Sequence, residues 1–159
     1  MDKKLTSSNP PGLRVKILFI GMVSLFAVIV PMLFMNISSN WSNSIEEDIF
    51  WLQKGGIPQK GDFIFFKRRI TAIDPDQDIT LVKKAVCVSG EYLIVGPNWV
   101  FCGGIYLGKI YPGLQPALFF GVIPKGKVFA MSTALDSYDS RYFGLINEEE
   151  IYAISKHAF

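Results

Sequence analysis

Histidine and cysteine are both scarce in this chain of 159 residues, and each scarcity excludes a class of protein. The single histidine, His157, lies two residues before the end of the sequence, so a Ser-His-Asp catalytic triad is not expected. Two cysteines, Cys87 and Cys102, are too few for a structural zinc site or a disulfide-rich miniprotein. Their spacing also differs from a Cys-x-x-Cys redox pair. They either form one disulfide or remain two free thiols.

Clustered charge is scarce as well. The formal net charge is +2, and basic residues are scattered except for Lys67-Arg68-Arg69, so the basic surface that a nucleic-acid-binding protein needs is missing. The sequence contains no glycine-rich phosphate loop and no spacing typical of metal ligands, and we expect neither a cofactor nor a metal. If the protein is an enzyme, its general base must therefore be a lysine, an aspartate or a glutamate.

One long apolar run is present near the N-terminus. Ile17 to Met35 extends for nineteen residues without a charge, which predicts a transmembrane anchor over residues 17–36 after a tail of residues 1–16. The polar segment that follows favours an uncleaved anchor over a cleaved signal peptide. A buried helix of a soluble protein is the other alternative. Basic residues precede the run and acidic residues follow it, which predicts a cytoplasmic N-terminus and a domain of residues 37–159 beyond the membrane: Lys3, Lys4, Arg14, Lys16, Glu46, Glu47 and Asp48.

After the apolar run the pattern changes to short apolar or alternating segments separated by glycine and proline, which is typical of strands. A mainly β domain is therefore expected. The predicted strands are Phe63–Arg69, Ile79–Val88, Tyr92–Val95, Trp99–Cys102, Ile105–Leu107 and Lys127–Met131. Residues 146–151 predict a short helix with Asn147 as its cap and acidic residues at the positive end of its dipole.

Two adjacent lysines, Lys83 and Lys84, lie within the longest predicted strand. Strand alternation sends them to opposite faces of the sheet, so one can be buried while the other is solvated. Burial lowers the pKa of a lysine and leaves a neutral amine able to take a proton from a serine hydroxyl. Taken alone, such a pair more often marks a strand edge with both amines in water.

The most specific motif of the chain is Ser137-Tyr138-Asp139-Ser140-Arg141-Tyr142-Phe143-Gly144, with Val122 to Met131 before it. This motif resembles the Ser-x-Asp-Ser-Arg-Tyr-Phe/Trp-Gly motif of signal peptidase I, a family of serine–lysine peptidases, and Val122 to Met131 is similar to the family's preceding segment. Val82 to Glu91 resembles the lysine block, in which the first basic residue is the general base. The resemblance therefore selects Lys83 over Lys84. It implies an N-terminal transmembrane helix followed by a coiled β-sheet or barrel domain.

The serine block is the most degenerate of the three. Ser42-Asn43-Ser44-Ile45 resembles the family's Ser-x-Ser-Met, just past the apolar run, and the following residues are similar to the conjugative-transfer branch of the family. The resemblance implies Ser44 as the nucleophile. The alternative is a serine- and asparagine-rich linker without a catalytic residue.

The resemblance also implies roles for the neighbouring residues. Lys83 would take the proton of Ser44, and Ser42 would help to stabilise the oxyanion. Ser137 would orient Lys83, while Asp139 and Arg141 would form a structural ion pair that holds their loop against the lysine strand.

The implied function is a membrane-anchored serine endopeptidase of the bacterial inner membrane, with its catalytic domain in the periplasm. Its substrate would be a pilin or another secreted precursor, and its further partners would be the lipid bilayer and conjugation or secretion proteins. Two alternatives stay open: a housekeeping signal peptidase I and a non-catalytic membrane-anchored scaffold. In an oxidising periplasm Cys87 and Cys102 would have conditions that allow a disulfide.

Overall fold

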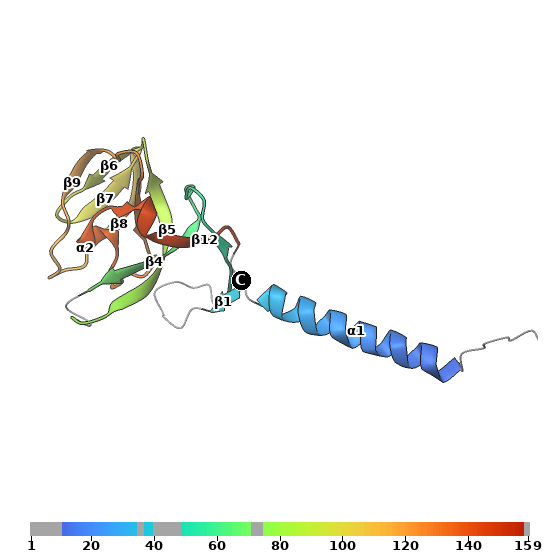
Figure 1. Ribbon diagram of the computed structural model, residues 1–159. Coiled ribbons are helices and arrows are strands. Elements are labelled where there is room, and N and C mark those ends of the chain that lie inside the picture. Colours follow the sequence, from blue (N-terminus) through green and yellow to red (C-terminus); the bar gives the residue numbers. More distant parts are fainter. Residues whose placement is uncertain (1–10, 35–36, 40–48, 71–74, 158–159) are drawn as a thin grey trace, which may run out of the picture. The chain divides into compact units, whose positions relative to one another are not determined.

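The computed structural model describes residues 11–34, 37–39, 49–70 and 75–157 of the chain. It divides the chain into two compact units, Met1–Asn36 and Ile37–Phe159. The first unit contains one helix, α1, which runs from Pro11 to Phe34 (Figure 1). The second unit contains the strands and the remaining helical turns.

Within the described residues, no helix combines the length and the apolar character that crossing a bilayer requires. Within α1, the structure describes the side chains without interruption only from residue 18 to residue 30. The predicted transmembrane span over residues 17–36 is therefore not supported by this part of the chain.

Antiparallel sheets form the second unit, which confirms the predicted mainly β class. One sheet has the order β11-β10-β5-β4-β12-β3 and another has the order β8-β7-β6-β9, and β1 pairs with β2. The strands are β1 Ile37–Ser39, β2 Ile49–Trp51, β3 Gln53–Lys54, β4 Phe63–Arg69, β5 Asp78–Val88, β6 Tyr92–Val95, β7 Trp99–Cys102, β8 Ile105–Lys109, β9 Phe119–Val122, β10 Lys127–Met131, β11 Ile146–Asn147 and β12 Ile151–Ser155.

All six predicted strands are present, and two of them are slightly longer than predicted. The predicted helix over residues 146–151 is wrong in extent: only Glu148–Glu150 form a 3₁₀ turn, and β11 and β12 flank it. The predicted cap is at the start of that turn, where the backbone N–H of Asn147 donates to the Glu150 carboxylate at 3.2 Å. A second helical segment, α2 Ser140–Phe143, lies within the motif that resembles signal peptidase I.

The two larger sheets meet at the end of β5, which has β4 and β10 as neighbours. Val86 has no opposite residue in β10, because Phe129 pairs with Cys87 and Ala130 pairs with Ala85. This β-bulge switches the inward face of the strand. As a result, Ala85 packs in one apolar cluster and Cys87 packs in another, which includes Leu93 and Val100 of the four-stranded sheet.

Candidate active site

Lys83 and Lys84 lie on opposite faces of β5, as strand alternation predicts. The Lys83 side chain is 4 % exposed and pairs in register with Ile64 of β4. Lys84 is exposed, and its amine lies 5.2 Å from the centre of the Phe63 ring. The buried lysine is therefore the one that the motif selects.

A serine from a distant part of the chain contacts the buried amine. Lys83 Nζ donates a hydrogen bond to Ser137 Oγ at 2.8 Å, and Ser137 is itself buried. Burial lowers the pKa of Lys83, and the nearby Arg141 guanidinium lowers it further, whereas Asp139 acts in the opposite direction. A lysine with a lowered pKa has a larger neutral fraction near neutral pH, which is the form that can accept a proton.

Asp139 and Arg141 form a buried ion pair beside this lysine. Their side chains are 0 % and 2 % exposed, and Arg141 Nη2 lies 2.7 Å from Asp139 Oδ2. Burial alone would lower the pKa of Arg141, but the hydrogen bonds and the negative charge of Asp139 outweigh it and raise that pKa. Arg141 is therefore charged in the folded protein, and its ion pair with Asp139 is fully desolvated.

The remaining hydrogen bonds of this pair fix the loop that carries Ser137. Arg141 donates to the carbonyl oxygens of Ala134 at 2.9 Å, Ser137 at 3.2 Å and Lys109 at 3.1 Å. Asp139 accepts from the backbone N–H of Ser132 at 3.0 Å. The pair thus determines the path of the backbone on both sides of the Ser137 hydroxyl.

One strand from each of the two larger sheets holds this loop. The bond from Ser132 attaches it just after the end of β10, the neighbour of β5, and the bond to Lys109 attaches it to the end of β8. Sequence reasoning missed Ser140, whose buried hydroxyl accepts from the backbone N–H of Ala130 at 3.1 Å and adds a further attachment to β10. The position of Ser140 next to Arg141 in the motif could have indicated this role.

The predicted nucleophile and the predicted oxyanion donor, Ser44 and Ser42, lie outside the described residues. Their roles therefore stay predictions of the sequence.

Cys87 of β5 and Cys102 of β7 form a disulfide with a Cα–Cα distance of 5.9 Å, which joins the two larger sheets. Glu91 lies beside the two sulfur atoms, and these three residues form a group with the spacing of metal ligands. Burial would raise the pKa of Glu91, but hydrogen bonds from Lys60 and from the backbone of Val88 lower it. Because both sulfurs are bonded to each other, the group offers no thiolate to a metal.

Comparisons with known proteins agree with part of the resemblance. Residues 109–159, which include Ser137, Asp139 and Arg141, match the family model described as signal peptidase, peptidase S26. A search of curated proteins found no match. Among solved structures, a signal peptidase I from Enterococcus faecalis matches with 19 % identity and a TM-score of 0.38, over 60 % of this chain and 94 % of that chain. The family match thus supports a relationship to the S26 signal peptidases, which are serine peptidases, over the segment that carries the Ser137 loop and its ion pair.

Proposed function

We propose that this protein is a serine endopeptidase in which Ser44 is the nucleophile and Lys83 is the general base. The observation that carries the proposal is the buried Lys83 amine, whose pKa is lowered and which is hydrogen-bonded to Ser137 at 2.8 Å. A non-catalytic scaffold has no need for a desolvated lysine, since burial of an unneeded charge costs stability. The match of residues 109–159 to the S26 family supports the same function.

In the proposed reaction, neutral Lys83 takes the hydroxyl proton of Ser44 while Ser44 Oγ attacks the scissile carbonyl carbon. The backbone N–H of Ser44 and the Ser42 hydroxyl stabilise the oxyanion, a contribution of about 3 kcal/mol for each well-placed donor. The protonated lysine then gives its proton to the leaving amine, and water or another amine releases the acyl group. Ser137 orients the lysine amine, and Asp139 and Arg141 position Ser137.

The substrate is a secreted or membrane-inserted precursor protein. The similarity of the serine block to the conjugative-transfer branch favours a pilin or another conjugation component, with housekeeping secretion as the second candidate. Anchorage through residues 17–36 stays a prediction of the apolar run, and a periplasmic location for residues 37–159 stays a prediction of the charge pattern. Protease protection of the full chain in intact and opened cells tests this topology.

The function is tested by co-expressing a pilin precursor with the wild-type protein and with three variants, followed by mass spectrometry of the product. We expect Ser44→Ala and Lys83→Ala to abolish cleavage, with a loss of rate of roughly a thousandfold or more. Lys84→Ala is the matched control, because it removes the exposed neighbour on the same strand, and it should keep wild-type activity. Cleavage that persists in Lys83→Ala at wild-type rate would disprove the proposed base. The product mass distinguishes a linear pilin from a cyclic one.

A further inference from the structure

The outer face of the four-stranded sheet is apolar, although it is exposed. Its inward residues alternate with outward ones, so that Val100 and Cys102 are buried while Trp99 and Phe101 point outward. Phe120, Ile94, Phe101 and Tyr106 lie opposite one another in register and form one row across all four strands. A continuous apolar row of this kind on the solvent side of a sheet marks a binding surface.

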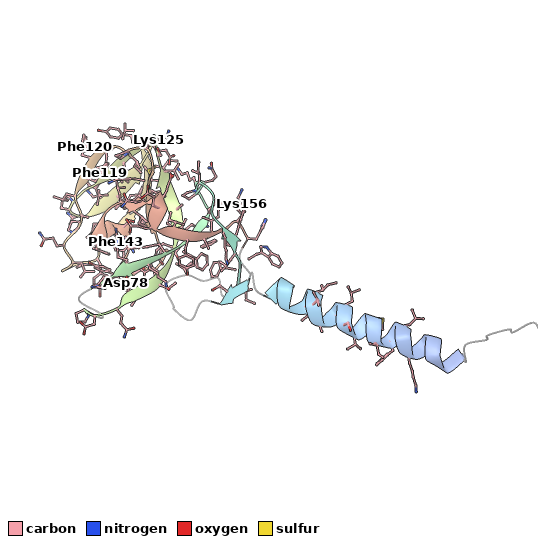
Figure 2. All side chains as sticks on the ribbon, in the orientation of Figure 1. Asp78, Phe119, Phe120, Lys125, Phe143 and Lys156 are labelled. Carbon is pink, nitrogen blue, oxygen red and sulfur yellow. A yellow bond between two sulfur atoms is a disulfide. The ribbon has the colours of Figure 1, made fainter. Side chains whose placement is uncertain are left out.

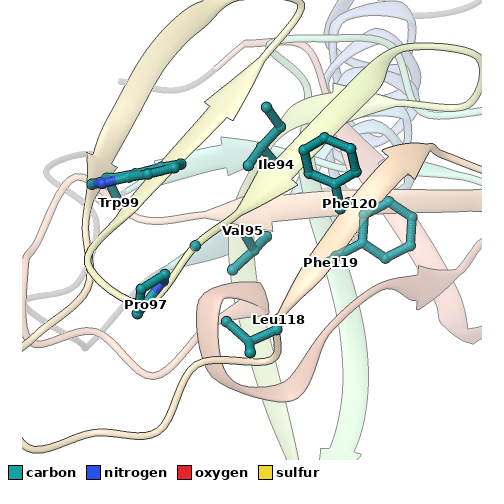
Figure 3. A pocket seen from close by; sticks show the side chains of 8 residues that line it. Ile94, Val95, Pro97, Trp99, Leu118, Phe119 and Phe120 are labelled. Carbon is teal, nitrogen blue, oxygen red and sulfur yellow. The ribbon is translucent and has the colours of Figure 1, made fainter.

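Phe120 is 75 % exposed at one end of this row, and Tyr106 is 50 % exposed at the other. Ring contacts join neighbouring aromatic residues: Trp99 with Phe101 at 5.3 Å and Phe101 with Tyr106 at 5.4 Å between ring centres. An apolar hollow of about 410 Å³ opens between Trp99 and Phe120, and Ile94 also lines it (Figure 3). Gly96 borders the hollow, where an added Cβ would lie 3.0 Å from the Trp99 ring.

The four strands of this face and the loops that join them carry charge of one sign. From Tyr92 to Val122 the chain has no carboxylate side chain, and its only charged residue is Lys109. Lys109 is exposed and lies opposite Trp99 in the β7–β8 register. Lys125, labelled with Phe119 and Phe120 in Figure 2, follows the last strand and shares a polar hollow with Glu148 and Glu149. Of these two lysines, Lys109 is therefore the one that belongs to the apolar face.

We propose that this face binds the surface of an anionic lipid bilayer. Tryptophan and tyrosine prefer the boundary between lipid headgroups and acyl chains, and aliphatic and phenylalanine side chains insert below it. A lysine on a sheet whose strands carry no carboxylate complements the negative surface of anionic lipids. A second copy of the chain fits less well, because two such faces would bring two lysines together with no carboxylate to pair with them. The side chains of this face belong neither to α1 nor to the candidate active site.

The test places a single fluorescent reporter on the face of the full chain. Trp41 and Trp51 are replaced by phenylalanine, so that Trp99 alone reports, and the protein is added to vesicles of phosphatidylcholine with about 30 % phosphatidylglycerol and brominated acyl chains. We expect bromine to quench Trp99, and we expect weaker quenching in vesicles of phosphatidylcholine alone. Because the reporter lies on β7, membrane binding through α1 does not produce the signal.

Three variants in the same background sharpen the test. Phe120→Ser removes an apolar side chain from the face and should reduce quenching strongly, and Lys109→Gln should weaken binding to the anionic vesicles about fivefold. Ile57→Ser is the matched control, because Ile57 is 68 % exposed but lies outside the four-stranded sheet, and it should change nothing.

Trp99 that stays unquenched while the full chain floats with the vesicles would overturn the proposal. Equal quenching in Phe120→Ser and in its parent would do so as well. A dimer in sedimentation that Phe120→Ser dissociates, without quenching of Trp99 by lipid, would assign the face to a second copy of the chain instead.

Discussion

The two larger sheets of the second unit differ in which side chains they bury, and each does the opposite of what is usual in one respect. The six-stranded sheet and its adjoining loop bury charged and polar side chains, among them Lys83, Asp139 and Arg141. The four-stranded sheet instead exposes large apolar side chains such as Phe120 and Trp99. Each departure costs free energy unless something compensates it.

The compensation differs between the two regions. The buried charges are satisfied within the protein, because Asp139 and Arg141 bond to each other and to the backbone. The exposed apolar side chains of the small sheet are not covered by any of the described residues, which leaves them available to a partner outside the molecule. In this protein a buried charge therefore indicates internal chemistry, whereas an exposed apolar face indicates an external partner.

The largest effect on the contrast between the two sheets is expected from Asp139→Ala. It leaves the Arg141 charge buried and unpaired, which should lower the free energy of unfolding by about 3–5 kcal/mol. Thermal unfolding of the full chain, followed by circular dichroism, measures the loss. Asp78→Ala is the control: its carboxylate and its partner Arg69 are 53 % and 55 % exposed, so the cost should stay below about 1 kcal/mol. Equal losses in the two variants would contradict the description of a buried pair.

A smaller loss of stability is expected from replacing both Cys87 and Cys102 by alanine. Loss of the disulfide, which joins positions fifteen residues apart, should lower the free energy of unfolding by about 3 kcal/mol. Chemical denaturation with and without a dithiol reductant checks this value. The reductant should destabilise the wild-type protein and leave the double variant unchanged. A wild type that is insensitive to complete reduction would show that the two sheets hold together without the bond.

The smallest change in stability, and a gain instead of a loss, is expected from Lys83→Met. Because burial lowers the pKa of Lys83, the unfolded chain binds more protons than the folded one between that lowered pKa and the ordinary 10.5. Lys83 therefore destabilises the fold fully below its folded pKa, and this cost disappears as the pH rises to 10.5. Lys83→Met should raise the unfolding temperature at pH 7, with a gain that shrinks at alkaline pH.

Lys84→Met provides the comparison, since it replaces an exposed lysine on the same strand and should not raise the unfolding temperature. A stability difference between Lys83→Met and wild type that stays constant from pH 7 to 10.5 would contradict a lowered pKa for Lys83.

Six of the twelve strands in the described part of the second unit could be predicted, because their apolar residues alternate clearly between glycine and proline turns. The short strands at the sheet edges could not, since β3 and β11 have two residues each and no period can be measured over two positions. The strand Phe119 to Val122 was not predicted for another reason. Gly121 weakens its local strand pattern, and the strand forms because it pairs with β6 in the sheet.

The candidate site could be predicted only in part. Strand alternation left Lys83 and Lys84 equivalent, and the motif was needed to choose between them. Contact between Lys83 and Ser137 spans 54 positions, and a contact at that separation depends on tertiary packing that no local pattern encodes. The same holds for Arg141, whose bond to the Lys109 carbonyl oxygen reaches across 32 positions.

The loop between β8 and β9 is fastened to α2 at both ends. The backbone N–H of Tyr111 donates to the Tyr142 hydroxyl at 2.9 Å, and that of Ala117 donates to the Arg141 carbonyl oxygen at 2.8 Å. Residues 112–115 between these two points are exposed. Extra chain inserted there leaves both attachments intact, so this position should tolerate an insertion without disturbing the buried charges of Asp139 and Arg141.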